Sequence, residues 1–354
     1  MPQRFLTSLP QLVSFAMLAV TLGLAELAPA RFERLMQEDG PAEWATFLAF
    51  ALAGGIGLRA LWKKRVEDKL ARLTLLAVCG FCLFVAGEEI SWGQRIIGFR
   101  PPALFLEHNF QQESNLHNLL KGILDTRWMV LMVAGLYGVV APYVIYLTRW
   151  PKVLAAPLAA LPWFAAIVWL EFAYPYELVG ELAELALGLA FLWDVIERSD
   201  VAAEPRRALR VGVMQAGALA GALVLVPLYE LSLSFHSEDL VAHTQEDLAT
   251  LAARMQDGDA LRSAVFKKRD VHKRLYTAVK AGYLALDPGE FYLDAWNSPY
   301  WFSFERTGER EGRVVLYSFG PNRKRDLGAH GTSANGDDVR LTFEVSAPAR
   351  ADAR

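Results

Sequence analysis

The sequence has few cysteines, few charged residues and no excess of basic ones. Its 354 residues include only two cysteines, Cys79 and Cys82, which lie inside an apolar run. Two cysteines exclude a disulfide framework, and a Cys-x-x-Cys pair in this setting is typical of small residues in a membrane helix rather than of a redox or metal site. The formal net charge of -3 does not favour a nucleic-acid partner.

Motifs of familiar chemistries are absent as well. There is no His-Glu-x-x-His or His-x-x-x-His metal motif, no nucleophile motif, no phosphate-binding loop and no nucleotide-binding fingerprint. The sequence therefore assigns no enzyme class, and it leaves open whether the chain catalyses a reaction.

Apolar residues are abundant, at 53% of the chain against 21% charged, and they form long runs before residue 235. A helix needs roughly 20 mainly apolar residues to cross the hydrocarbon of a membrane. Seven segments come close to this length: Leu12–Ala30, Trp44–Trp62, Leu73–Glu89, Trp128–Leu147, Val153–Leu170, Leu178–Ile196 and Val211–Leu233. We therefore predict a transmembrane helix bundle over residues 1–235, within the lipid bilayer, and a separate polar domain over residues 236–354.

The basic residues between the predicted spans indicate the orientation, because cytoplasmic connections carry the excess of lysine and arginine. The connections after the second, fourth and sixth spans are basic and include Lys63-Lys64-Arg65, Arg149 and Arg206-Arg207, whereas residues 171–177 contain no basic residue. All three basic connections fall on one side when the chain starts in the cytoplasm. We expect a multi-pass protein of the bacterial inner membrane with a cytoplasmic N-terminus and a periplasmic C-terminal domain.

Polar residues gather near the outer ends of these spans. The third span ends in two glutamates, the connection after it contains two histidines, and the sixth span opens with three glutamates at i, i+4 and i+7, which share one helical stripe. A carboxylate inside hydrocarbon costs roughly 2.5–3.5 kcal/mol and normally faces a partner or a water-filled cavity. We therefore predict a pocket whose candidate site residues are Glu88, Glu89, His108, His117 and Glu181.

Several uses of such a pocket remain open. Imidazole and carboxylate ligands would suit zinc or manganese. A pair of glutamates could instead carry out acid–base catalysis on a lipid or lipid-linked substrate, or the carboxylates could bind a cationic head group or peptide. In the remaining alternative the residues only brace the fold. The same connection contains Pro101-Pro102, followed by patterns for short interfacial helices over residues 103–110 and 116–124.

The apolar pattern changes after the seventh span. Residues 236–255 predict an amphipathic helix, and the helical pattern continues over residues 261–286 after a break at Asp257-Gly258-Asp259. Strand-like runs follow over residues 300–305 and 314–319. The predicted fold class is thus mainly α, a polytopic membrane helix bundle with a C-terminal α+β domain made of a long helix and a small antiparallel sheet.

Two stretches of this domain have distinctive amino-acid sequences. Residues 293–300 read Leu-Asp-Ala-Trp-Asn-Ser-Pro-Tyr and residues 317–322 read Tyr-Ser-Phe-Gly-Pro-Asn. They resemble the Asp-x-Trp-Gly-Asn-Pro-Tyr and Tyr-Ser-Leu-Gly-Ala-Asp stretches of the major pseudopilin of type II secretion, and residues 339–341 occupy the place of that family's closing Ala-Asp-Ile. The resemblance implies a pseudopilin-like domain that binds a pseudopilus or a secreted protein.

The same resemblance implies a calcium ion, because in that family the loop after Ser-x-Gly binds one. Calcium takes oxygen ligands, and the positions that correspond here are Ser318, Asn322, Asp326, Asp337 and Asp338. This chain departs from the family by placing Arg323-Lys324-Arg325 in the loop, and these cations weaken a nearby cation site.

A second departure lies before the domain. Pseudopilins carry a short leader cut before a phenylalanine, with a glutamate five residues further on, and residues 207–215 contain neither. We therefore expect a domain that stays tethered to the bundle and does not polymerise. A binding or assembly role at the outer face is one hypothesis, and an intramembrane hydrolase or transferase that uses the outer pocket is the other.

Overall fold

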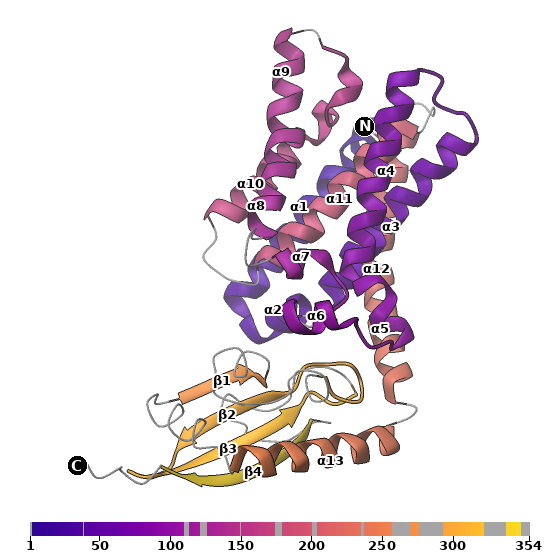
Figure 1. The fold of residues 1–354 in the computed structure, drawn as a ribbon. Helices are drawn as coiled ribbons and strands as arrows, with labels where there is room; N and C mark the ends of the chain where they lie inside the picture. Colours follow the sequence, from indigo (N-terminus) through magenta and orange to yellow (C-terminus); the bar gives the residue numbers. More distant parts are fainter. Residues whose placement is uncertain are drawn as a thin grey trace, which may run out of the picture. The chain divides into compact units, whose positions relative to one another are not determined.

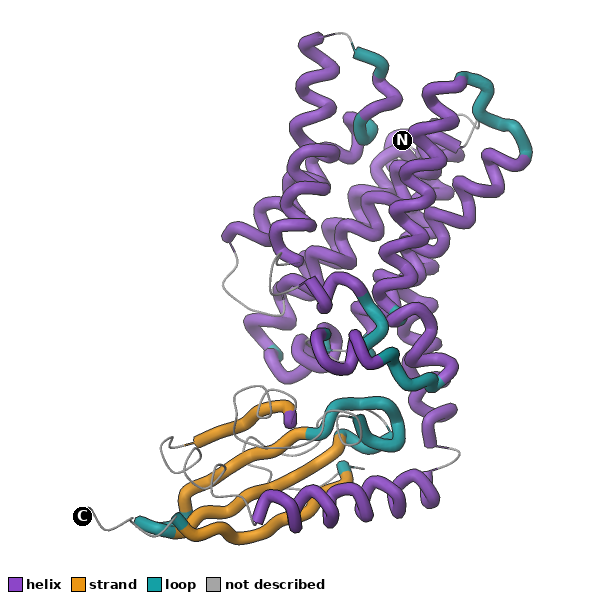
Figure 2. Tube along the Cα trace, viewed as in Figure 1, coloured by secondary structure: helices purple, strands orange, loops and turns teal. Residues whose placement is uncertain are grey.

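The computed structural model divides the chain into two compact units, one made of residues 1–93 and 115–227 and the other of residues 94–114 and 228–354. Figure 1 colours the helices and strands along the sequence, and Figure 2 separates helix from strand. The structure describes residues 2–37, 39–109, 113–120, 126–148, 150–173, 179–199, 204–234, 237–256, 270–275, 293–321 and 338–347.

The first unit consists of helices (Figure 2). Long apolar stretches favour this architecture, because a helix satisfies all its backbone hydrogen bonds internally and needs no water. The elements are α1 Pro2–Leu27, α2 Pro29–Met36, α3 Pro41–Trp62, α4 Lys69–Glu89, η1 Ser91–Gly93, α7 Leu116–Leu120, α8 Thr126–Met132, the π-helix η2 Val133–Val140, α9 Ala141–Thr148, η3 Lys152–Leu154, η4 Leu158–Ala160, α10 Leu161–Ala173, α11 Val179–Ser199 and α12 Glu204–Ser234, which runs past residue 227.

Six of the described segments are long and apolar enough to cross a membrane, which indicates a multi-pass membrane protein. They are Leu9–Leu27, Pro41–Trp62, Lys69–Glu89, Arg127–Thr148, Lys152–Phe172 and Pro205–Leu231. Six of the seven predicted spans coincide with these segments. The remaining one is the sixth span, predicted over Leu178–Ile196. It corresponds to the helix α11, which carries more charged side chains than the other six.

The helix α11 forms the buried centre of the first unit. Nearly every residue from Leu182 to Ile196 is buried, including Asp194. A small residue allows α3 to come close, because a Cβ placed on Gly188 would lie 3.2 Å from the Cβ of Ala49. Asp194 is thus fully enclosed, whereas the glutamates of α11 are half-buried.

In its described residues, the second unit contains the end of α12, two short helices, one long helix and an antiparallel sheet with strand order β1-β2-β3-β4 (Figure 1). Its elements are α5 Gln94–Ile97, α6 Ala103–His108, α13 Ser237–Gln256, β1 Asp270–Arg274, β2 Trp301–Arg306, β3 Glu311–Ser318 and β4 Val339–Ser346. The apolar side of α13 packs on the sheet through Leu248, Leu251 and Met255, which share a buried cluster with Phe302 and Leu316. The predicted amphipathic helix and small antiparallel sheet are therefore confirmed.

One predicted element is wrong in part. The helical pattern over residues 261–286 contains the strand β1, which pairs antiparallel with β2 so that Asp270 lies opposite Glu305 and Arg274 opposite Trp301. Pairing with a neighbouring strand overrides the local helical preference, because strand formation depends on cross-strand contacts more than on the residues themselves. The rest of that predicted helix lies outside the described residues.

Candidate functional site

The carboxylate of Glu88, at the end of α4, is the centre of a buried hydrogen-bond network. It is 5% exposed. Its Oε1 accepts a hydrogen bond from Nε1 of Trp92 at 2.6 Å, and its Oε2 accepts from the backbone N–H groups of Leu116 at 2.6 Å and His117 at 2.8 Å. One side chain therefore fixes both the turn after α4 and the start of α7.

The turn that returns Trp92 to Glu88 has a strained backbone. Ser91, Trp92 and Gly93 have φ angles of 47°, 54° and 87°. A residue other than glycine in this region costs on the order of 1–3 kcal/mol and persists only where the surroundings impose it. Here the indole–carboxylate bond imposes it, together with a hydrogen bond of 3.3 Å from Nδ2 of Asn115 to Oγ of Ser91. Such strain concentrates at functional sites.

A glycine makes room for the indole. A Cβ placed on Gly87 would lie 3.0 Å from the ring of Trp92, which is closer than two carbon atoms pack without strain. Trp92 also contacts Phe84 edge-on, with ring centroids 5.9 Å apart. Gly87 therefore makes room for the ring of Trp92, which remains about half exposed.

Next to this network lies a cavity of about 130 Å³. Its walls are mainly apolar, and its polar lining consists of an imidazole and three carboxylates. The lining residues come from α3, α4, α7, α8, η2 and α11: Phe50, Phe81, Phe84, Val85, Glu88, Glu89, His117, Met129, Val130, Val133, Glu184 and Leu187. All of them belong to the first unit.

The imidazole of His117 is oriented by Glu88. Its Nδ1 lies 3.4 Å from Oε2 of Glu88, so that the tautomer with a proton on Nδ1 points that proton at the carboxylate. Nε2 then carries a lone pair that can accept a proton. A carboxylate that orients an imidazole in this way is the arrangement of a general base.

Only some of the predicted site residues lie together at the cavity. Glu88, Glu89 and His117 line the cavity together. Glu181 is half-buried on α11, one turn before the lining residue Glu184, and is not itself part of the lining. His108 belongs to the second unit, where it is exposed and its Nδ1 lies 3.3 Å from the carbonyl oxygen of Leu104.

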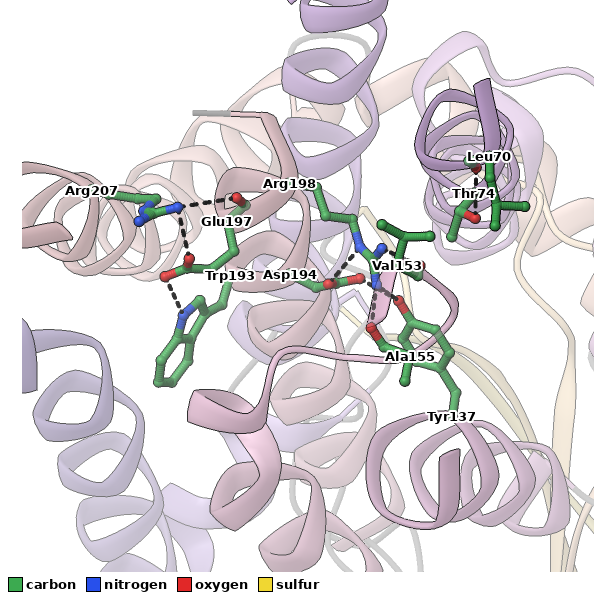
Figure 3. Close-up of polar contacts among 10 residues, drawn as sticks. All are labelled: Leu70, Thr74, Tyr137, Val153, Ala155, Trp193, Asp194, Glu197, Arg198 and Arg207. Carbon is green, nitrogen blue, oxygen red and sulfur yellow. Dashed lines mark hydrogen bonds and ion pairs between the residues drawn. The ribbon is translucent and has the colours of Figure 1, made fainter. Parts of the chain in front are cut away.

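A second buried polar cluster lies elsewhere in the first unit (Figure 3). Asp194 is fully buried, and its two oxygens accept hydrogen bonds from Tyr137 at 2.5 Å and from Nε of Arg198 at 2.7 Å. The guanidinium also donates to the carbonyl oxygens of Val153 and Ala155, each at 2.5 Å. Because these charges are paired and hydrogen-bonded to backbone on several sides, the cluster is best understood as a structural tie between η2, η3 and α11.

The described residues contain no group of three or more His, Cys, Asp or Glu side chains placed to hold a metal ion. Comparisons with protein-family models, curated proteins and solved structures found no match for this chain. The interpretation of the site therefore depends on its own geometry.

In the second unit, the turn between residues 293 and 300 is organised by Asp294, which is 5% exposed. Its Oδ1 accepts from the backbone N–H groups of Trp296 at 2.9 Å and Ser298 at 2.8 Å, and its Oδ2 accepts from the hydroxyl of Ser318. That hydroxyl in turn accepts from the N–H of Gly320 at 3.0 Å. The two stretches that resemble the pseudopilin are thereby joined by side-chain hydrogen bonds.

The predicted calcium ligands are only partly described. Ser318 is buried at the end of β3, with its hydroxyl engaged by Asp294, and Asp338 is half-buried just before β4. Asn322, Asp326 and Asp337 lie outside the described residues.

Sequence analysis did not identify Trp92 or Asn115 as site residues, whereas Glu184 belongs to the stripe of glutamates that predicted the pocket. The signal that could have found the turn is the unusual density of Gly, Ser and Trp immediately after two adjacent glutamates.

Proposed function

We propose that this chain is a membrane-embedded enzyme of the hydrolase or transferase class, which acts on a lipid or lipid-linked substrate through the cavity beside Glu88 and His117. The observation that carries the proposal is the buried carboxylate of Glu88, held by three N–H donors, which presents an oriented imidazole to a mainly apolar cavity.

His117 serves as the general base. Its Nε2 takes a proton from water, for hydrolysis, or from a hydroxyl group of an acceptor, for transfer, while Glu88 stabilises the resulting imidazolium. No serine, cysteine or threonine is among the described residues that line the cavity, which favours direct attack by the activated oxygen. Glu89 and Glu184 also line the cavity. They are the candidates for donating a proton to the leaving group or for binding the substrate.

The proposed topology has seven spans, with α11 as the central one, a cytoplasmic N-terminus and a periplasmic C-terminal domain in the bacterial inner membrane. Support comes from the length of α11, 21 residues, which suffices to cross roughly 30 Å of hydrocarbon. Its enclosure by the other helices offsets the cost of its acidic side chains. The basic connections supply the orientation.

The test compares purified wild-type protein with His117→Ala and His108→Ala, each in nanodiscs with a total lipid extract. Mass spectrometry of the lipids before and after incubation detects turnover. We expect turnover by the wild type and by His108→Ala, which changes an exposed histidine of the other unit, and none by His117→Ala. Equal turnover by His117→Ala would refute the proposed role of the imidazole, provided that all three proteins fold to the same extent.

A second candidate function concerns the second unit. We propose that its C-terminal part is a pseudopilin-like domain that binds a pseudopilus or a secreted protein. The specific observation in its favour is that Asp294 joins the two stretches on which the resemblance rests, through Ser318. The helix α13 packed on an antiparallel sheet is also compatible with this type of domain.

Calcium binding gives the sharpest test of that second candidate. A ligand that binds only the folded state raises the melting temperature by mass action. The wild type should melt higher with calcium than with chelator, and Asp337→Ala combined with Asp338→Ala should remove the difference. Identical melting with calcium and with chelator would show that the Arg323-Lys324-Arg325 insertion has replaced the ion.

A further inference from the structure

A second cavity, which we call the α12 groove, lies between α1, α2, α3, α11 and α12. Its described lining residues belong to the first unit and carry no charge: Val13, Ala16, Met17, Val20, Thr21, Leu35, Met36, Pro41, Ala42, Ala45, Leu185, Leu219 and Leu223. None of them lines the cavity beside His117. The two cavities are therefore distinct sites.

The α12 groove offers hydrocarbon contacts rather than hydrogen bonds. Thr21 has the one polar side chain among the described lining residues, and its hydroxyl already hydrogen-bonds to the carbonyl oxygens of Met17 at 2.8 Å and Leu18 at 3.1 Å. A polar occupant would lose its hydrogen bonds to water without replacement, whereas hydrocarbon has none to lose. The groove therefore suits an apolar chain.

Two lining residues show where the groove opens. Val20 on α1 is 62% exposed and Leu223 on α12 is 59% exposed, and both belong to segments that are long and apolar enough to cross a membrane. The opening thus faces the hydrocarbon of a bilayer, where the acyl chains of lipids are the molecules at hand.

The size of the groove fits one such chain. At about 440 Å³, it has roughly three times the volume of an engineered cavity of about 150 Å³ that binds benzene. Three times the size of benzene corresponds to about 18 non-hydrogen atoms, which is the length of one acyl chain. A whole phospholipid is larger, so its head group would have to lie outside the groove.

The helix α2 connects the groove to the level of the lipid head groups. It begins two residues after the apolar segment of α1 ends, which is where a chain leaves the hydrocarbon and enters the interface. Its buried side chains, Phe32 and Met36, pack into the core of the bundle, and Leu35 and Met36 line the groove. The groove and the interface therefore meet at α2.

The exposed side of α2 carries positive charge at this position. Arg31 and Arg34 are both exposed. Arg31 precedes the lining residue Leu35 by four positions, so these two side chains share a stripe of the helix, and Arg34 is one turn from Arg31. Glu33 is also exposed, but at 3.6 residues per turn it projects about 200° away from Arg31. Guanidinium groups form paired hydrogen bonds with phosphate, so a phosphate at this end of the groove would have two cations within reach.

From these observations we infer that the α12 groove binds an anionic phospholipid, with one acyl chain in the groove and the head-group phosphate at Arg31 and Arg34. An apolar groove and a pair of arginines are independent features, and they are adjacent on one helix. The inference does not depend on the proposed reaction, because it uses no residue of the cavity beside His117.

The experiment counts bound lipids on the full-length protein in detergent by native mass spectrometry, over a series of lipid concentrations. The probes are phosphatidylglycerol and phosphatidylcholine with identical palmitoyl and oleoyl chains, which differ in the net charge of the head group. We expect phosphatidylglycerol to bind about fivefold or more tightly, the effect of one arginine close to an anionic lipid. Equal affinity for the two lipids would overturn the inference.

Charge variants test the contact with the head group. Arg31→Gln and Arg34→Gln should each weaken the binding of phosphatidylglycerol about fivefold and leave the binding of phosphatidylcholine nearly unchanged. Arg59→Gln changes an exposed arginine in the last turn of α3 and should behave as wild type. If both variants of α2 keep the full preference for phosphatidylglycerol, the arginines do not hold the head group and the inference is wrong.

Bulky variants test the contact with the acyl chain. Val20→Trp and Leu223→Trp fill the groove from exposed positions, so each should weaken the binding of both lipids about tenfold. Val213→Trp adds the same ring to α12 at a residue that is 57% exposed and outside the described lining, and it should bind both lipids as the wild type does. Undiminished binding in both groove variants would mean that lipid associates only with the general surface of the bundle, and it would overturn the inference. If a tryptophan lowers the melting temperature of the lipid-free protein, the arginine variants decide the outcome.

Discussion

Replacement of Glu88 by glutamine tests the hydrogen-bond network at the end of α4, because glutamine has nearly the same size and shape as glutamate but no charge. The carboxylate offers two accepting oxygens to three N–H donors, whereas glutamine offers one oxygen and an NH2 group. The best orientation keeps the oxygen towards Leu116 and His117, and it then places the NH2 group against the N–H of Trp92. One charge-assisted hydrogen bond is lost, which costs about 1.5–3 kcal/mol.

Hydrogen exchange detects this loss locally. The backbone N–H groups of Leu116 and His117 exchange when the segment separates from residue 88. In Glu88→Gln both groups keep an acceptor, but neither hydrogen bond is charge-assisted any longer, so the free energy of opening should fall by about 1.5–3 kcal/mol and exchange should accelerate by roughly 10- to 100-fold. Mass spectrometry of peptides that cover residues 114–120 gives the rates for the intact protein in detergent. Glu67→Gln, which changes an exposed residue, should leave them unaltered. Exchange in Glu88→Gln within about twofold of wild type would refute the assignment of Glu88 as the anchor of this segment.

Three further predictions concern other parts of the chain. In denaturant unfolding, Asp294→Asn should destabilise the second unit by about 1 kcal/mol and Asp294→Ala by about 3 kcal/mol. The asparagine variant should lose less because it retains an acceptor for the two backbone N–H groups of the turn. Equal losses in the two variants would contradict this account. Burial, aided by the nearby charges of Asp294 and Asp247, raises the pKa of Tyr300, whose hydroxyl donates to Asp247 at 2.9 Å. As the pH rises, the unfolded chain loses the Tyr300 proton at a lower pH than the folded chain does. The free energy of unfolding should therefore decline above about pH 10. The decline should be smaller in Tyr300→Phe. A reporter after Arg354 should behave as periplasmic and one near Asp200 as cytoplasmic, and the reverse result would reject the proposed orientation.

The helical spans were accessible from the sequence because the membrane imposes a simple requirement of length and hydropathy. The same requirement does not reveal which helix lies in the middle. Glu181 and Glu184 of α11, expected to share a helical stripe, were associated with a pocket, and Glu184 does line the cavity. The enclosure of almost the whole helix nevertheless depends on how α3, α4 and α10 pack around it. Packing of that kind is a tertiary property.

The candidate site, too, was only partly predictable from the sequence. Glu88 and His117 were among the expected residues on the grounds of charge in an apolar setting, but their meeting spans 29 positions of sequence and depends on a turn with three positive φ angles. No local pattern predicts such a turn, since serine and tryptophan rarely adopt this conformation. The strand β1 was missed for a related reason, because its partner β2 lies far along the chain.

The composition of α11 has a consequence for the assembly of the protein in the membrane. A segment with Glu181, Glu184 and Asp194 between its ends partitions poorly into lipid by itself, since each central acidic residue opposes insertion by roughly 2.5–3.5 kcal/mol. In the proposed topology it would enter the bilayer beside helices synthesised earlier, which supply Tyr137 as a partner for Asp194. The translocation machinery would thus have to retain the preceding helices until α11 arrives, and the order of synthesis, with α3, α4 and α10 before α11, allows this.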